Sequence, residues 1–328
     1  MTTVYGYRAN EFCYWFAGAF AWSLIAYFQA FGVSLDFDNY KQYFSLTRSL
    51  GVESLFLYRF EPGFALLATF LASLSSDDNL VYAAIVLLAG VIKGFAFADL
   101  RVGFLAIFLL LVFYTLRFLP LHELNQLRAS VGTAFLLIFA VRGERSRLEG
   151  AVFATLAVSF HYSSLVSIAF WLLGGVGIRR FFLVLSLGAA ALVFMLDPVL
   201  QYVLSQLQVG VMYEALGLNF GKLNYFNPLV LLDIGMVVFM LLHWSRLPPS
   251  SKRSLLVISF GIIAYYFAAD SQAFAHRIRE MTSVFWLLIL AREMMRRGYR
   301  RNICVIFIGL SALGHLYSSF FGSRPLFL

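Results

Sequence analysis

An arginine and a histidine lie at corresponding ends of two apolar segments in the middle of the chain. Arg128 precedes the segment 129–141, and His161 ends the segment 150–161. The loop that joins the segments is basic and contains Arg142, Arg145 and Arg147. Because such loops remain in the cytoplasm when apolar segments cross a membrane, the hairpin brings Arg128 and His161 to the opposite surface. There an arginine can bind an oxyanion and a histidine can act as a general base.

The composition is typical of a helical membrane protein. The chain has 328 residues, of which 61% are hydrophobic and 13% are charged, whereas a soluble domain is about 45–50% apolar and about 25% charged. Apolar runs recur from end to end, so we predict an all-α polytopic integral membrane protein with about 11–12 transmembrane helices. We expect one transmembrane domain over residues 1–328. The net charge of +8 resides mainly in short loops, so nucleic acid is not an expected partner.

Four Lys/Arg-rich loops determine the predicted orientation. They lie at 142–147, 179–180, 246–253 and 292–301. Two apolar runs separate each neighbouring pair, so all four loops are predicted to be cytoplasmic and the polar loop 198–227 to face outward. The aromatic, amphipathic segment 33–61 faces outward if the short run 62–74 is re-entrant, which its proline start favours. It faces the cytoplasm if that run crosses.

The predicted outer face carries arginines where the charge rule predicts few. They are Arg128, Arg277 and Arg279. A planar guanidinium matches phosphate oxygens, and a lipid-linked diphosphate is one anion present at this surface. Alternatively, these arginines reach lipid headgroups or pair with Glu123 and Glu280. We also expect His122 and Glu123 at this surface, just ahead of Arg128.

Carboxylates and aromatic rings on the same face suit a sugar substrate. Glu61 is placed to deprotonate a sugar hydroxyl, although a carboxylate at a helix start is also a common capping device. His161 is a second candidate base, or an interfacial histidine with no role in chemistry. Asp36, Asp38 and Tyr40 suggest carbohydrate contact, and a solvated loop is the alternative.

Several kinds of chemistry are not supported. The sequence contains no Walker A loop, dinucleotide-binding glycine pattern, HExxH motif or GxSxG motif, which argues against nucleotide-driven chemistry and against zinc or serine hydrolysis. No acidic cluster argues for a metal. We therefore expect no metal and no cofactor.

Four segments and a late Arg–Ile pair occur in a characteristic order. They are DFDNY (36–40), YRFEPGF (58–64), NQLRASVGTAF (125–135), LAVSFHYSSLV (156–166) and Arg277–Ile278. In this order and spacing the chain resembles the EpsG family of Wzy-type polysaccharide polymerases over most of its length. Ala129 and Ser130 depart from that pattern, which more usually has a polar residue after the arginine.

The resemblance implies a GT-C-like glycosyltransferase of the bacterial inner membrane, with its site facing the periplasm or exterior. Such an enzyme transfers a growing polymer from undecaprenyl diphosphate to a new lipid-linked repeat unit. The implied partners are the lipid-linked donor and acceptor and the bilayer, with a chain-length regulator and a flippase as further candidates.

The resemblance and the residues together give three sets of candidate site residues. The catalytic candidates are Glu61, His161 and Asp38. The diphosphate-binding candidates are Arg128, Arg277, Arg279 and Arg59. The sugar-binding candidates are Asp36, Tyr40, Tyr162 and His276.

Three other functions fit parts of the pattern. An O-antigen ligase has the same outward-facing chemistry but delivers the glycan to a different acceptor. A lipid-linked glycan transporter or flippase places ionisable groups near the bilayer midplane, where Lys93, Asp233 and Asp99 are the candidates. A structural membrane subunit leaves the outward arginines without a purpose.

Overall fold

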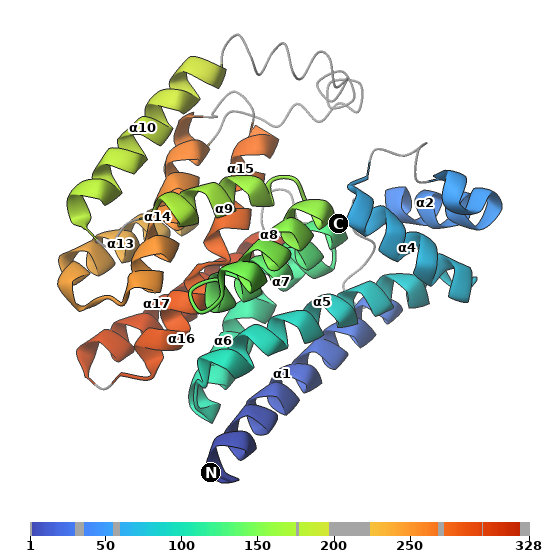
Figure 1. Ribbon diagram of the computed structural model, residues 1–328, viewed down its shortest axis with the longest axis horizontal. Coiled ribbons are helices and arrows are strands. Elements are labelled where there is room, and N and C mark those ends of the chain that lie inside the picture. The colour runs from blue at the N-terminus through green and yellow to red at the C-terminus, as the bar shows by residue number, and fades with distance from the viewer. Residues whose placement is uncertain are drawn as a thin grey trace. The chain divides into compact units, whose positions relative to one another are not determined.

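Helices form all of the regular secondary structure in the residues that the structure describes (Figure 1). The computed structural model describes residues 2–29, 36–54, 60–174, 177–196, 224–267, 272–296 and 298–321. Two compact units divide the chain: residues 1–168 with 287–328, and residues 169–286. The predicted all-α fold is confirmed over the described part of the chain.

The first unit contains the predicted apolar segments 62–74, 129–141 and 150–161, which form α4, α7 and α8 with bounds within three residues of those predicted. The elements of this unit are α1 (Thr2–Phe28), α2 (Phe37–Leu50), the 3-10 turn η1 (Gly51–Glu53), α4 (Pro62–Leu74), α5 (Asp78–Leu100), α6 (Phe104–Arg117), the π-helix η2 (Leu119–Glu123), α7 (Leu127–Arg142), α8 (Arg147–Phe160) and α17 (Tyr299–Phe321). Two further helices, α9 (Ser164–Leu173) and α16 (Trp286–Met294), contain the points where the chain passes between units.

The second unit contains the remaining elements. They are α10 (Ile178–Leu196), α13 (Pro228–Leu242), the 3-10 turn η3 (Trp244–Arg246), α14 (Pro249–Phe267) and α15 (Gln272–Ser283). The Arg277–Ile278 pair lies within α15.

One described helix, α5, is both long and apolar enough to cross a bilayer by itself. The shorter apolar helices are α4, α6, α9 and α13. A full span needs about 20 residues at about 1.5 Å each, so the number of crossings stays a prediction from the sequence.

Two sets of contacts distinguish the ends of the first unit. At one end, which we call the basic end, Asp99 at the end of α5 pairs with Arg142 at the end of α7, with Nε to Oδ2 at 2.7 Å. At the other end, which we call the polar end, Gln29 after α1 donates to Asn79 at the start of α5 at 3.0 Å. Helix α5 therefore runs from the polar end to the basic end.

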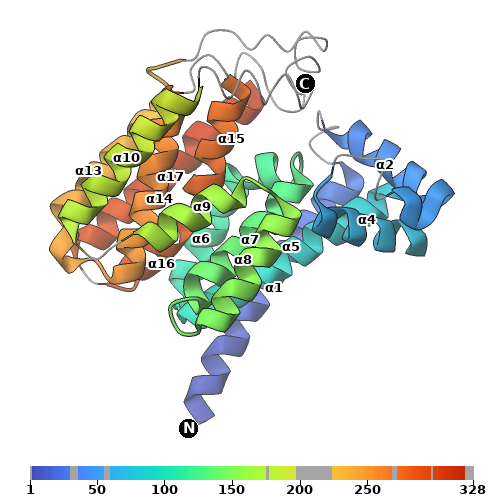
Figure 2. The ribbon, with the colours of Figure 1, turned by 45° about the horizontal axis from the view of Figure 1, so that its top comes forward.

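Both termini of α4 lie at the polar end. Glu61, just before α4, pairs with Arg128 at the start of α7. After α4, Arg48 of α2 donates to the carbonyl oxygen of Ser75 at 3.1 Å and pairs with Asp78 at 2.7 Å. Helix α4 therefore enters and leaves at the same end of the unit, and α2 lies beside it, away from the basic end (Figure 2).

Close helix packing forms the core of the first unit. Trp15 of α1 donates its indole N–H to the carbonyl oxygen of Gly90 in α5 at 3.0 Å. A Cβ atom at Gly90 would lie only 2.4 Å from the Cβ of Ala19. Small residues at this contact allow the two backbones to approach, a common device in membrane helix pairs.

A buried ion pair joins α5 to the π-helix η2. The Nζ of Lys93 lies 2.7 Å from Oε1 of Glu123, and neither side chain is exposed. Tyr114 of α6 donates to the same carboxylate oxygen.

The expectation that His122 and Glu123 lie at the surface beside Arg128 is wrong, because both are fully buried. The π-helix adds a residue to the turn and directs Glu123 inward to Lys93.

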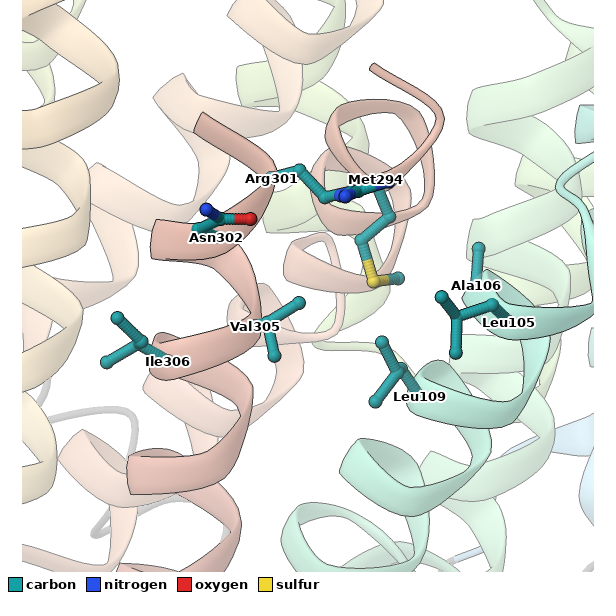
Figure 3. A pocket seen from close by; sticks show the side chains of 8 residues that line it. All are labelled: Leu105, Ala106, Leu109, Met294, Arg301, Asn302, Val305 and Ile306. Carbon is teal, nitrogen blue, oxygen red and sulfur yellow. The ribbon is translucent and has the colours of Figure 1, made fainter. Parts of the chain in front are cut away.

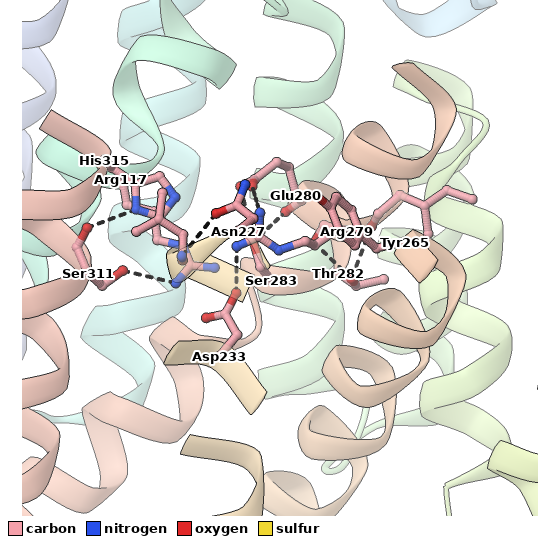
Figure 4. A network of polar contacts seen from close by, with 12 residues as sticks. Arg117, Asn227, Asp233, Tyr265, Arg279, Glu280, Thr282, Ser283, Ser311 and His315 are labelled. Carbon is pink, nitrogen blue, oxygen red and sulfur yellow. Dashed lines mark hydrogen bonds and ion pairs between the residues drawn. The ribbon is translucent and has the colours of Figure 1, made fainter. Parts of the chain in front are cut away.

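Side chains of the second unit form a second buried charge cluster, and Figure 4 includes them. Arg279 of α15 contacts Asp233 of α13 at 2.8 Å and Glu280 at 3.0 Å. Gly261 of α14 lets Thr282 approach, because a Cβ at Gly261 would overlap the Thr282 hydroxyl. The cluster and the close contact hold α13 and α14 to α15.

Candidate functional site

The carboxylate of Glu61 joins two of the predicted site residues in the first unit. Its Oε2 accepts from Nη1 of Arg128 at 2.7 Å, and its Oε1 lies 3.2 Å from Nδ1 of His161. The backbone N–H of Tyr162 also points at Oε1, at 3.4 Å. Three helix ends meet here: the start of α4, the start of α7 and the end of α8. The sequence therefore identified three residues that the fold brings into one contact.

The backbone before α4 presents Glu61 to this contact. Pro62 occupies the first turn of α4, and Glu61 has the extended conformation (φ −62°, ψ 142°) that a following proline favours. The side chain makes no hydrogen bond that caps the helix. Helix capping therefore does not account for this glutamate, whose oxygens are directed to Arg128 and His161.

Two glycines permit the approach of the helices. A Cβ atom at Gly132 of α7 would lie 2.8 Å from the Cβ of His161, and one at Gly63 of α4 would lie 2.8 Å from the carbonyl oxygen of Ser159. These separations are shorter than van der Waals contact, so larger residues would push α8 away from α7 or α4. The sequence analysis missed both glycines, although Gly63 follows the Glu–Pro pair directly and Gly132 lies one helical turn beyond Arg128.

The ion pair keeps Glu61 charged. Burial alone would raise its pKa, but the hydrogen bond with His161 and the charge of Arg128 lower the pKa of Glu61 to about 2. Glu61 is therefore a carboxylate near neutral pH, and its contacts with Arg128 and His161 oppose its protonation. Its side chain is only 5% exposed, whereas that of Arg128 is 26% exposed, so the arginine is the member of the pair that an anion from solution can reach.

An aromatic cluster supports the guanidinium of Arg128. The ring of Phe60 lies under the guanidinium carbon, 4.8 Å from it, in cation–π geometry. Tyr40 of α2 packs on Phe60 and Phe64 and is buried. Burial raises the pKa of Tyr40 to about 12, against the lowering effect of Arg128. Tyr40 is thus a neutral phenol that supports Arg128, and its ring is not open to a sugar.

The remaining candidates of the first unit are distributed around this contact. Tyr162 is 59% exposed and is available for stacking. The backbone N–H of Asp36 donates to Oδ1 of Asn125 at 3.2 Å, which ties the start of α2 to the segment before α7. Asp38 is exposed in the first turn of α2. Arg59 lies outside the described residues.

The other three candidates belong to the second unit. Arg279 is 2% exposed and is already bound by two carboxylates, as the alternative interpretation of pairing with Glu280 predicted. Arg277 is half-buried. His276 packs edge-on against Tyr265 with ring centroids 5.0 Å apart.

The charge balance of the Glu61 contact favours an anionic ligand over a metal ion. No group of three His, Cys, Asp or Glu side chains suited to a metal occurs among the described residues. Glu61 and His161 supply two potential ligand atoms, but the guanidinium of Arg128 occupies one oxygen of the carboxylate. The same guanidinium repels a cation and attracts phosphate.

Comparison with known proteins gives one match. A protein-family model described as the EpsG family matches residues 12–325. No curated protein and no solved structure matches the chain significantly.

Proposed function

Because the chain belongs to the EpsG family, a family of Wzy-type polymerases, we propose that it polymerises undecaprenyl-diphosphate-linked oligosaccharides at the outer face of the bacterial inner membrane. The growing chain is transferred as a block to a new repeat unit. The observation that carries this proposal is the carboxylate of Glu61 held between Arg128 and His161. A proton acceptor and an anion-binding group thus lie next to one another at one end of the first unit.

The charge distribution supports this orientation. Arg142, Arg145 and Arg147 mark the basic end, which we assign to the cytoplasm. The polar end, with Glu61 and Arg128, then faces the periplasm or exterior, where lipid-linked repeat units are used. Helix α4 has both ends on that side and lies in the membrane as a re-entrant element.

We assign the donor diphosphate to Arg128. Its guanidinium is supported by Phe60, partly exposed and held by one short contact to Glu61. An oxyanion that binds Arg128 competes with Glu61 for the same N–H groups, so donor binding loosens the carboxylate. Arg277 and Arg59 are candidates for further phosphate contacts. Arg279 instead holds α13 to α15, because its charge is already balanced.

The reaction follows from this competition. The acceptor sugar hydroxyl attacks the anomeric carbon of the donor, a C–O bond forms, and the bond from that carbon to the diphosphate breaks. The diphosphate leaves with the electron pair and is stabilised by Arg128. The hydroxyl proton passes to Glu61, and His161 orients the carboxylate through Nδ1 or takes the proton in its place.

The sugar contacts are assigned to residues around the carboxylate. Tyr162 presents an exposed ring beside Glu61, which suits stacking on a pyranose. Asp38 and Asp36 lie at the start of α2 and are candidates for hydroxyl contacts. His276 stays a candidate from the sequence alone.

Reconstitution tests the proposed activity. Purified protein in liposomes, supplied with lipid-linked repeat units in the leaflet facing the polar end, is expected to produce a ladder of lipid-linked polymers without a flippase. A Glu61→Gln variant purified in parallel should give single units only. Movement of the substrate between leaflets without polymer would indicate a transporter. Transfer of preformed polymer to another acceptor, without elongation, would indicate a ligase.

A further inference from the structure

A groove lies between α6 and α17 of the first unit, and none of the residues that line it belongs to the Glu61 contact (Figure 3). Its volume is about 450 Å³. Leu105 and Leu109 of α6 form one wall, and Val305 and Ile306 of α17 form the other. Helix α6 starts at the basic end, because it follows the terminus of α5 that contains Asp99. The first turns of α17 line the groove opposite the first turns of α6, so α17 starts at the same end. The groove therefore opens near the basic end.

The mouth of the groove carries an uncompensated positive charge. Arg301 lies at its end beside Met294 (Figure 3) and is exposed. Neighbouring arginines are neutralised: Arg300 contacts Glu293 at 2.6 Å, and Arg292 contacts Glu144 at 3.8 Å. Arg301 has no such carboxylate among the described residues. A cation at the mouth and apolar walls beyond it match an anionic headgroup followed by an acyl chain.

We propose that this groove binds one anionic glycerophospholipid of the cytoplasmic leaflet, with its phosphate at Arg301 and an acyl chain between α6 and α17. The proposal rests on the membrane orientation given under the proposed function. Free phosphate would use Arg301 alone and leave the apolar walls exposed to water. A lipid matches both the cation and the apolar walls. Its headgroup lies at the depth of the basic loops, and its acyl chain replaces water along Val305 and Leu109.

Native mass spectrometry of the purified protein tests this site. The wild type, titrated with phosphatidylglycerol in mild detergent, is expected to retain one lipid more firmly than the Arg301→Ala variant. Loss of one cation near an anionic headgroup should weaken retention about fivefold. A Val305→Phe variant keeps the charge but fills the groove, and should weaken retention of the lipid as well. Phosphatidylethanolamine, with no net charge, should be retained weakly by all three proteins.

Matched controls separate this site from general attraction to the basic end. Arg147, an exposed arginine at the start of α8 and also at the basic end, does not line the groove, so Arg147→Ala should retain lipid as the wild type does. Equal retention by the wild type and both groove variants would overturn the proposal, as would displacement of the lipid by inorganic phosphate. The assay requires no glycan, so wild-type polymerisation without lipid retention would refute the groove and leave the proposed function standing.

Discussion

Lys93 donates from Nζ to both the carbonyl oxygen and the hydroxyl oxygen of Ser130, at 2.9 and 3.1 Å. Ser130 lies two residues beyond Arg128, on the opposite face of α7. A fully buried lysine in α5 thus fixes the turn of α7 from which Arg128 reaches Glu61. Ionisable residues within apolar helices are costly and usually functional. We assign this one to positioning the start of α7.

Replacing Lys93 with methionine should destabilise the first unit strongly. The change leaves Glu123 buried without its cation, and breaking such a pair typically costs about 3–5 kcal/mol. The double variant Lys93→Met, Glu123→Gln removes both charges and should recover much of the loss. Thermal unfolding of the purified proteins in detergent measures both effects. A single variant that unfolds at the wild-type temperature would show that the pair does not secure α7.

Alanine at position 132 should impair polymerisation more than it impairs folding. The added Cβ would lie 2.8 Å from that of His161, so the end of α8 must move and the Nδ1 contact to Glu61 lengthens. Gly309 of α17 provides the matched control, since a Cβ there has nothing within 4 Å. We expect glycan length to fall for Gly132→Ala and to remain normal for Gly309→Ala at equal protein level. Equal glycan lengths in the two variants would argue against a requirement for the close packing of α8 against α7 at Gly132.

The stability contributed by Glu61 should depend on pH only in acid. Its pKa in the folded protein, about 2, lies below the ordinary value of 4.5. The contribution is therefore present above pH 4.5 and is lost as the pH falls towards 2. Because His161 contacts the carboxylate and histidine titrates near neutral pH, the comparison is made in a His161→Ala background. There the stability difference caused by Glu61→Gln should be constant from about pH 5 to 9 and should shrink in stronger acid. A difference that changes steadily between pH 5 and 9 in this background would mean that Glu61 titrates there and is not held by Arg128.

A lysine at position 128 should not preserve donor binding by Arg128. The planar guanidinium contacts Glu61 and stacks over Phe60, and its fork of N–H groups matches phosphate oxygens, whereas an ammonium is a point charge without the fork. We expect Arg128→Lys to bind lipid-linked donor at least about tenfold more weakly. Donor titration in the liposome assay measures this. Wild-type affinity in the lysine variant would show that charge alone suffices.

The sequence allowed the helices to be predicted, but not the contact at their ends. Charge sidedness placed Arg128 and His161 on one face, whereas the side of the segment that ends at Glu61 was left open. Residue type and the family-like pattern made Glu61 a candidate, and only the fold shows its contact with the other two. The burial of Glu123 was not predictable, since its partner Lys93 lies 30 residues away and no periodicity indicates the π-turn. Tyr40 was assigned to sugar binding from its type, and only the packing against Phe60 shows its ring to be covered.

The length distribution of lipid-linked glycan in cells that carry Arg128→Ala or His161→Ala tests the central claim most directly. Compared with wild type at equal protein level, both variants should accumulate single repeat units, because one loses the diphosphate contact and the other loses the partner of the Glu61 carboxylate. Normal polymer in both variants, on the lipid and on its final acceptor, would contradict the account and leave the contact of Glu61 with Arg128 and His161 a structural one.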